Sequence, residues 1–209
     1  MHNAETSLHD RLSALDALLT ALLRDGRVDV EDPRTKDVIR SQMSQILAMP
    51  GGSAALVARY AADKRVAVVR PLAFLLGVAV NDRDQADALS ETVFAMISGL
   101  QTDDPWARLN LCTAVQRLLM FGAVSGSEAP KPGLSKLLLE SLDGIPPLRA
   151  TAATVVADLF YGRHTAVVSA ADLAILQTRL LELTDDETDE LTRKEAQGLR
   201  EFLEKLLSD

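Results

Sequence analysis

Apolar residues recur along most of the chain at the three- and four-residue steps that are typical of α-helices. Gly, Pro and short polar stretches separate these segments. At several expected helix starts, proline occupies a position that the first helical turn tolerates. The pattern predicts an all-α fold. We expect helices at residues 5–24, 34–48, 53–68, 71–80, 84–100, 105–121, 133–142, 147–161, 169–183 and 188–207.

One of these boundaries depends on a proline. Pro71 directly follows Arg70, lacks a backbone N–H and disfavours helical geometry in the residue before it. Residues 63–80 are therefore expected to form either one kinked helix or two helices.

An arginine recurs near the start of four apolar segments, at spacings of 38, 41 and 44 residues. Such a near-periodic run is typical of helical repeats, in which each helix pair is too small to bury its apolar face alone and stacks on its neighbours. The abundance of Leu, Ala and Val agrees with closely packed helices. The recurring residues are Arg70, Arg108, Arg149 and Arg193.

The two ends of the chain are expected to cap a single domain that spans residues 1–209. Residues 51–187 supply the central repeats, because 66–80 is apolar nearly all round, whereas the last helix, within 188–209, has one apolar stripe. In the N-terminal cap, residues 1–50, five leucines form a narrow stripe that covers the first repeat or, alternatively, builds a homodimer. These are Leu8, Leu12, Leu15, Leu19 and Leu22.

Several helices open with an acidic residue or proline, then an arginine, then an apolar run such as LNLCTAVQRLL or ATAATVVADLF. Over roughly residues 63–207 these segments resemble the second helices of HEAT repeats. The resemblance implies a right-handed α–α superhelix, a HEAT-like solenoid, of about five helix pairs. Because HEAT-type proteins are mostly scaffolds and adaptors, it also implies a noncatalytic protein that binds a protein partner through its concave face.

In the HEAT family, the acid at a helix start and the arginine often form a ladder between neighbouring repeats. Arg149 departs from this pattern, because Ile145 and two prolines stand where its acid is expected, and this leaves Arg149 available to a ligand. The arginines either make hydrogen bonds at repeat junctions or line the inner surface and bind an anionic partner. The matching positions are Asp63, Asp104 and Asp189 with Arg70, Arg108 and Arg193.

The net charge of −8 argues against a surface that follows nucleic-acid phosphates. Residues 182–209 hold ten acidic and four basic side chains, so the rest of the chain carries only −2. That rest includes one basic cluster, and a nucleic-acid or phosphate-binding module that uses it is the alternative function. The cluster consists of Arg59, Lys64, Arg65 and Arg70.

Trp106, at the opening of an expected helix, is a candidate for contact with the protein partner, because tryptophan is enriched at interface hot spots. Alternatively, it packs across its own helix start. Residues 123–133, the longest Pro- and Gly-rich interruption, are expected to be mobile. With arginines from the repeat and the basic cluster, the candidate partner-binding residues are Trp106, Arg108, Arg149, Arg59 and Arg65.

No motif indicates catalysis or a cofactor. The histidines His2, His9 and His164 are too dispersed for a metal site. The turn Pro50-Gly-Gly-Ser53 lacks the lysine and the strand-to-helix context of a phosphate-binding loop. We therefore expect no metal, no cofactor and no enzymatic activity.

Cys112 and Asp158 are the residues that would carry chemistry if the chain were an enzyme. Cys112 lies in an apolar helical run, which is more typical of a core thiol than of a nucleophile. Asp158 stands among apolar residues and is expected to pair with Arg117 or Arg149. Convergence of Cys112 and Asp158 with His164 in one pocket would revive an enzyme hypothesis.

The protein is expected to be cytoplasmic. Cys112 is the single cysteine and cannot form an internal disulfide, and the N-terminus lacks the basic flank and apolar stretch of a secretory signal. The longest strongly apolar stretch, Leu72–Val80, has nine residues, far below the roughly 20 that a membrane-spanning helix needs. No membrane partner is predicted.

Overall fold

The computed structural model describes residues 7–23, 33–124, 129–162, 164–183 and 189–208. Within these ranges the chain is helical and contains no strand, which confirms the predicted all-α class. No helix of the described residues is both long and apolar enough to cross a membrane. The helices are α1 (Leu8–Leu23), α2 (Pro33–Leu47), α3 (Gly52–Tyr60), α4 (Val66–Ala79), α5 (Arg83–Gly99), α6 (Pro105–Met120), α7 (Leu134–Leu142), α8 (Pro146–Tyr161), the short η1 (Thr165–Val167), α9 (Ala170–Glu182) and α10 (Glu190–Ser208).

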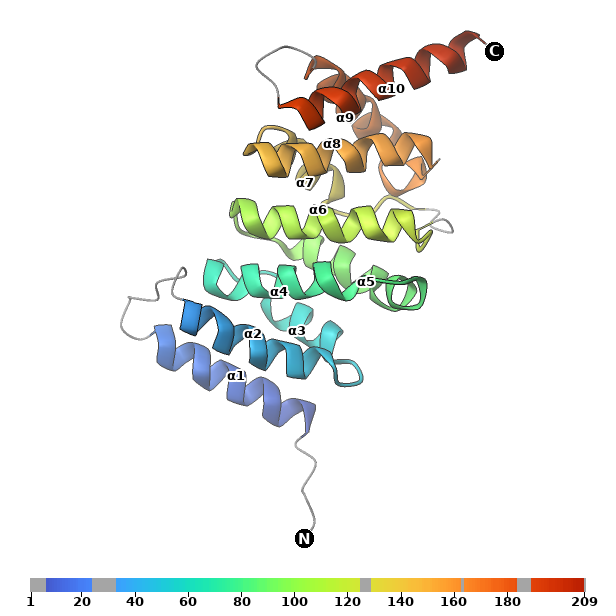
Figure 1. Cartoon of the computed structure of the whole chain (residues 1–209). Coiled ribbons are helices and arrows are strands. Elements are labelled where there is room, and N and C mark those ends of the chain that lie inside the picture. Colours follow the sequence, from blue (N-terminus) through green and yellow to red (C-terminus); the bar gives the residue numbers. More distant parts are fainter. Residues whose placement is uncertain (1–6, 24–32, 125–128, 163, 184–188, 209) are drawn as a thin grey trace.

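The helices stack in two rows (Figure 1). Each of α2, α4, α6 and α8 packs on the next even-numbered helix, and we call these four helices together with α10 the even row. The helices α3, α5, α7 and α9 pack on one another in the same way and form the odd row. α1 packs on α2 at the N-terminal end of the stack. Consecutive helices of the two rows also contact each other, so apolar faces are buried both within and between the rows.

The predicted helix boundaries differ most from the structure around Pro71. α3 ends at Tyr60, earlier than predicted, because Asp63 Oδ1 accepts a 2.8 Å hydrogen bond from the Arg65 backbone N–H and holds a local turn. Pro71 lies inside α4, where its missing N–H removes one helical hydrogen bond, the bond to the carbonyl of Ala67. Of the two alternatives, one helix across Pro71 is therefore correct.

The leucine stripe of α1 packs inside the chain. Leu15 and Leu19 are buried, Leu12 is nearly so, and Leu8 and Leu22 pack against the same core. Because α1 lies on α2, the stripe covers the first helices of the stack, as one of the two expectations stated. It is not exposed for a homodimer in this structure.

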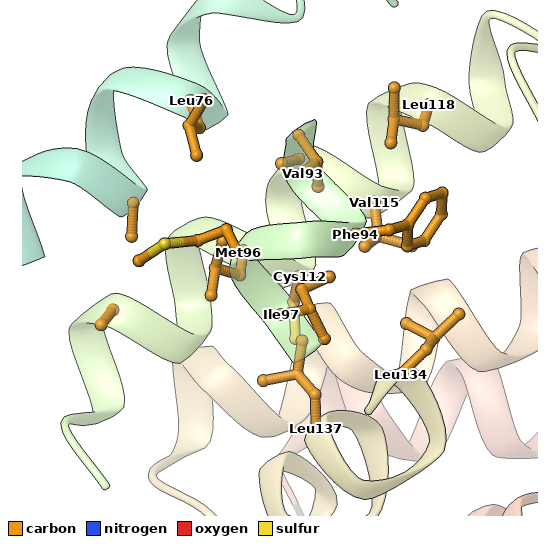
Figure 2. Packing of buried hydrophobic residues seen from close by; sticks show 14 of the residues in the cluster. Leu76, Val93, Phe94, Met96, Ile97, Cys112, Val115, Leu118, Leu134 and Leu137 are labelled. Carbon is orange, nitrogen blue, oxygen red and sulfur yellow. The ribbon is translucent and has the colours of Figure 1, made fainter. Parts of the chain in front are cut away.

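One continuous apolar core runs from α1 to α10. Figure 2 shows its middle, where α5, α6 and α7 meet around Met96, Cys112 and Leu137. Burial raises the pKa of the Cys112 thiol to about 12, and the thiol donates to Ser141 Oγ at 3.7 Å. Because the thiolate is the reactive form, Cys112 is a core residue and not a nucleophile at neutral pH.

Gly52→Ala is expected to destabilise the fold by about 1–3 kcal/mol. A Cβ atom at residue 52 would lie 1.8 Å from the carbonyl oxygen of Ile46, a backbone atom that cannot move without shifting the end of α2. Urea unfolding followed by far-UV circular dichroism measures the change. The matched control is Ser53→Ala, one residue further along α3, which should change stability by less than about 0.5 kcal/mol. Equal effects of the two substitutions would contradict the steric argument.

Candidate binding site

A cavity of about 490 Å³ opens on the even row where α2, α4 and α6 lie side by side. Its volume is within the range of roughly 300–1,000 Å³ that is typical of ligand sites. Residues from all three helices line it, so the stacking of the row creates it. The lining side chains that decide its chemistry are Lys36, Ile39, Arg40, Arg70, Phe74 and Trp106.

Trp106 is the aromatic residue at the mouth of this cavity. It is 45% exposed, although tryptophan is a large apolar side chain. Its position follows from the start of α6, where Asp104 accepts a 2.8 Å hydrogen bond from the Ala107 N–H and Pro105 is the first helical residue. Asn110, one turn later, donates to the Trp106 carbonyl at 2.8 Å and also lines the cavity. The structure therefore places one predicted partner-binding residue on a concave, partly apolar surface.

Arg40 of α2 lies over the ring of Phe74 of α4. The distance from Arg40 Cζ to the ring centroid is 4.4 Å, which is a cation–π contact. The Arg40 Nε atom is buried and finds no acceptor among the described residues. A planar cation is thus held against the wall of the cavity by an aromatic ring rather than by a carboxylate.

Arginine–carboxylate pairs join neighbouring helices of the even row. Arg70 of α4 donates to Asp104, the residue that caps α6, at 2.6 Å and 3.1 Å. Asp104 is buried. Arg149 of α8 lies with its Nη1 atom 3.9 Å from Oδ2 of Asp189, which caps the start of α10. In both pairs the acid belongs to the helix start of the next even-numbered helix.

This geometry corrects the expectation for Arg149. The acid that pairs with Arg149 comes from the start of the next even-row helix, α10, and not from the start of α8. By the same rule, an acid at the start of α8 would pair with Arg108 of α6, so its absence affects Arg108 and not Arg149. Arg108 pairs with Asp103 at 2.7 Å and with Glu140 of α7 at 2.8 Å. Arg149 also donates to the carbonyl of Gly144 at 3.0 Å, so it is not a free cation.

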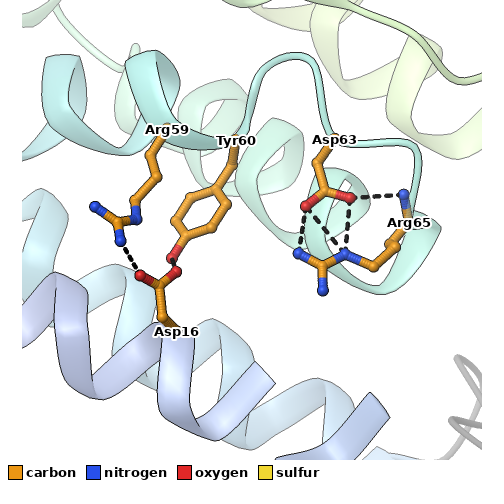
Figure 3. Close-up of polar contacts among 5 residues, drawn as sticks. All are labelled: Asp16, Arg59, Tyr60, Asp63 and Arg65. Atoms are coloured by element: carbon orange, nitrogen blue, oxygen red, sulfur yellow. Dashed lines mark hydrogen bonds and ion pairs between the residues drawn. The ribbon is translucent and has the colours of Figure 1, made fainter. Parts of the chain in front are cut away.

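Carboxylates also neutralise the two exposed arginines of the basic cluster (Figure 3). Arg59 pairs with Asp16 of α1, which accepts a second hydrogen bond of 2.6 Å from the Tyr60 hydroxyl. Arg65 Nε donates to Asp63 at 2.9 Å. Burial opposes ionisation of Asp16, but the bonds from Arg59 and Tyr60 outweigh it and lower the pKa of this carboxyl. Arg59 and Arg65, two of the predicted partner-binding residues, therefore have partners within the chain.

Asp158 does not pair with either predicted arginine. Arg117 instead donates to the carbonyl of Gly77 at 2.7 Å and so joins α6 to α4, and Arg149 pairs with Asp189. The charged neighbour of Asp158 is Glu195 of α10. Burial and then the charge of Glu195 raise the pKa of the Asp158 carboxyl. The prediction of a basic partner is wrong because the next helix brings an acid to this place.

Cys112, Asp158 and His164 have separate surroundings. Cys112 contacts Ser141 in the core, Asp158 lies near Glu195 on the even row, and His164 follows α8 at the start of η1. None of the three lines the cavity. In the described part of the chain, no three or more His, Cys, Asp or Glu residues are grouped so that they could hold a metal ion.

Reasoning from the sequence missed Lys36, Arg40 and Phe74. Lys36 is the fourth residue of α2, the place that Arg108 has in α6, and it stands 34 residues before Arg70. A search of the recurring position for lysine as well as arginine would have found Lys36. The contact between Arg40 and Phe74 has no such signal, because it arises from the packing of α2 on α4.

Comparisons of the chain with known protein families, with curated protein sequences and with solved structures find no match.

Asp104→Asn is expected to destabilise the fold by about 3 kcal/mol. Asparagine still caps α6, but the carboxylate charge that pairs with the largely buried Arg70 at 2.6 Å is lost. The control is Asp103→Asn, which removes an adjacent carboxylate that also pairs with an arginine but is 99% exposed. The control should not change stability measurably, because solvent screens an exposed pair. Urea unfolding of both variants tests this, and similar losses would show that burial of the pair does not matter.

Asp158→Asn is expected to raise the thermal midpoint at pH 7. The pKa of Asp158 is above its ordinary value of 3.8 in the folded protein, so stability falls as the pH rises from that value through the folded pKa. The amide cannot ionise, so the gain should be present at pH 7 and absent at about pH 3, where both states hold the protonated carboxyl.

Thermal unfolding at the two pH values measures this gain. The control Asp87→Asn, at an exposed position of α5, should give no gain at pH 7. A gain from Asp158→Asn that is equal at both pH values would exclude the electrostatic explanation.

Proposed function

We propose that the protein is a noncatalytic helical-repeat scaffold or adaptor that binds a protein partner through the exposed surface of the even row. Two rows of stacked helices fit the right-handed α–α superhelix, a HEAT-like solenoid, that the recurring arginines predict. In such a superhelix the even row forms the concave face. The lone cysteine and its burial support a reducing compartment, for which we propose the cytoplasm.

One observation carries this proposal. Of the nine large apolar side chains that are exposed among the described residues, seven belong to even-row helices and an eighth, Ile145, caps α8. Only Ile175 belongs to the odd row. The concentration of exposed apolar side chains on one row of helices favours that row as the interaction surface. The seven are Val38, Val78, Trp106, Met120, Tyr161, Leu191 and Leu206.

The spread of these side chains supports a protein partner in particular. Trp106 and Met120 lie at opposite ends of α6, 45% and 68% exposed. Tyr161 lies at the end of α8, where its ring contacts Phe202 of α10 edge-on, with centroids 5.1 Å apart. A small ligand would contact only one of these places, whereas a protein surface or an extended segment contacts several.

The alternative, a nucleic-acid or phosphate-binding module, has less support. Arg59, Arg65 and Arg70 of the basic cluster are each paired with an aspartate of this chain. A phosphate would have to displace these carboxylates before it could bind there.

The even-row variants Trp106→Ala and Met120→Ser are expected to lose the protein partner. The full chain and its variants are immobilised, nuclease-treated lysate is passed over them, and retained proteins are quantified by mass spectrometry. The specific partner should fall about ten-fold with each variant, because each removes a large exposed apolar contact. Circular dichroism confirms that the variants are folded.

The matched control for this experiment is Ile175→Ser, which removes an exposed apolar side chain from α9 in the odd row. It should retain the partner at the wild-type level. Loss of the partner with Ile175→Ser alone, or retention only of nucleic acid when the nuclease is omitted, would contradict the proposed function.

A further inference from the structure

We propose that the cavity between α2, α4 and α6 binds an acidic segment of the partner, with one aromatic or large aliphatic side chain inserted beside Phe74 and Trp106. This inference rests on the proposed function and names the chemistry that the even row recognises. Three features of the described residues carry it: the apolar wall, the charge of the lining, and the guanidinium of Arg40 that lies over Phe74.

The apolar wall gives the inserted side chain its place. Ile39, Ala67 and Pro71 are buried lining residues, while Phe74 is partly exposed and Trp106 is 45% exposed. The cavity has a volume of about 490 Å³, within the range that is typical of ligand sites. An aromatic or aliphatic side chain that enters it removes apolar surface from water on both sides.

The charge of the residues that line the cavity favours acidic residues next to the inserted side chain of the partner segment. The ionisable side chains that line the cavity are Lys36, Arg40 and Arg70, and all three are cationic. Asp104 already balances Arg70 at 2.6 Å. None of the described residues that line the cavity is a carboxylate, so this lining attracts carboxylates and repels ammonium and guanidinium groups.

Arg40 is the cation best placed to bind a carboxylate. Its guanidinium carbon lies over the Phe74 ring, 4.4 Å from the centroid, and its buried Nε has no acceptor among the described residues. Because the aromatic ring has already restricted the side chain, little rotamer entropy is lost when a carboxylate binds the remaining N–H groups. An acidic residue next to the inserted side chain would make this contact.

Fluorescence anisotropy with the full chain tests the proposal. The probe is a labelled synthetic peptide, GSDEFEDSG, and two controls alter one property each: GSDEAEDSG lacks the aromatic side chain and GSKKFKKSG reverses the charge. The acidic aromatic peptide should bind at least about ten-fold more tightly than either control. The affinity of the acidic aromatic peptide should fall as the salt concentration rises, because salt screens the attraction between its carboxylates and the cations of the cavity.

Variants assign the binding to this cavity. Arg40→Gln and Trp106→Ala should each weaken binding about ten-fold, and Arg40→Lys should recover only part of the loss because lysine lacks the planar fork. The control Arg83→Gln removes a 75% exposed arginine from α5 and should leave binding unchanged. Lys36→Gln replaces Arg40→Gln in the test if the latter fails to fold by circular dichroism.

Three outcomes would overturn the inference: equal binding of the lysine peptide, unchanged binding with Arg40→Gln, or competition by phenylacetate at the concentration at which the peptide itself competes. The last would identify a site for small aromatic acids. These failures are distinct from failure of the proposed function. If the partner is lost with Met120→Ser while no acidic peptide binds, the even row binds its partner by another chemistry.

Discussion

Successive helices of the even row lie with their N-terminal ends side by side, and this arrangement requires negative charge at those ends. The contact of Arg70 with the cap of α6 and that of Arg149 with the cap of α10 both join N-terminal turns. The N-terminus of a helix carries partial positive charge, and an arginine in its first turns adds to it. A carboxylate at the next helix start offsets both charges at once. Where Ile145 stands in place of this acid at the start of α8, Arg108 pairs with Asp103 and Glu140 instead.

This constraint separates two kinds of cation on the same surface. Arg70, Arg108 and Arg149 are occupied in contacts that hold neighbouring helices together, so the positive charge of these three recurring arginines serves the stacking of the helices. Arg40 is different, because an aromatic ring rather than an acid holds its guanidinium. Arg40 and Trp106 both line the cavity that α2, α4 and α6 form. The surface proposed for the partner therefore combines exposed apolar side chains with a cation that the fold has not neutralised with a carboxylate.

Much of the secondary structure could be predicted from the sequence, because apolar periodicity, caps and helix-breaking residues act within one or two turns. The boundaries agree closely except before α4, where the Asp63 turn ends α3 early. Only some of the candidate functional residues could be predicted in this way. Trp106 was found because its residue type and helix-start position are local features. The partner of Arg149 was missed because Asp189 stands 40 residues away, and the neighbour of Asp158 was missed because Glu195 comes from another helix. Arg40 and Phe74 carried no signal in their own segments.

The amino-acid pattern alone determined that the chain is helical, that its helices are too short to bury their apolar faces alone, and that Cys112 belongs to the core. These properties follow from hydrophobic spacing along single helices. Only the tertiary structure decided which acid each arginine meets, that the leucine stripe of α1 is buried, and that Arg40, Phe74 and Trp106 surround one cavity. The physical reason is that these contacts join residues from different helices, 34 residues apart in the case of Arg70 and Asp104. Their geometry depends on how one helix is seated on the next, which no local pattern specifies.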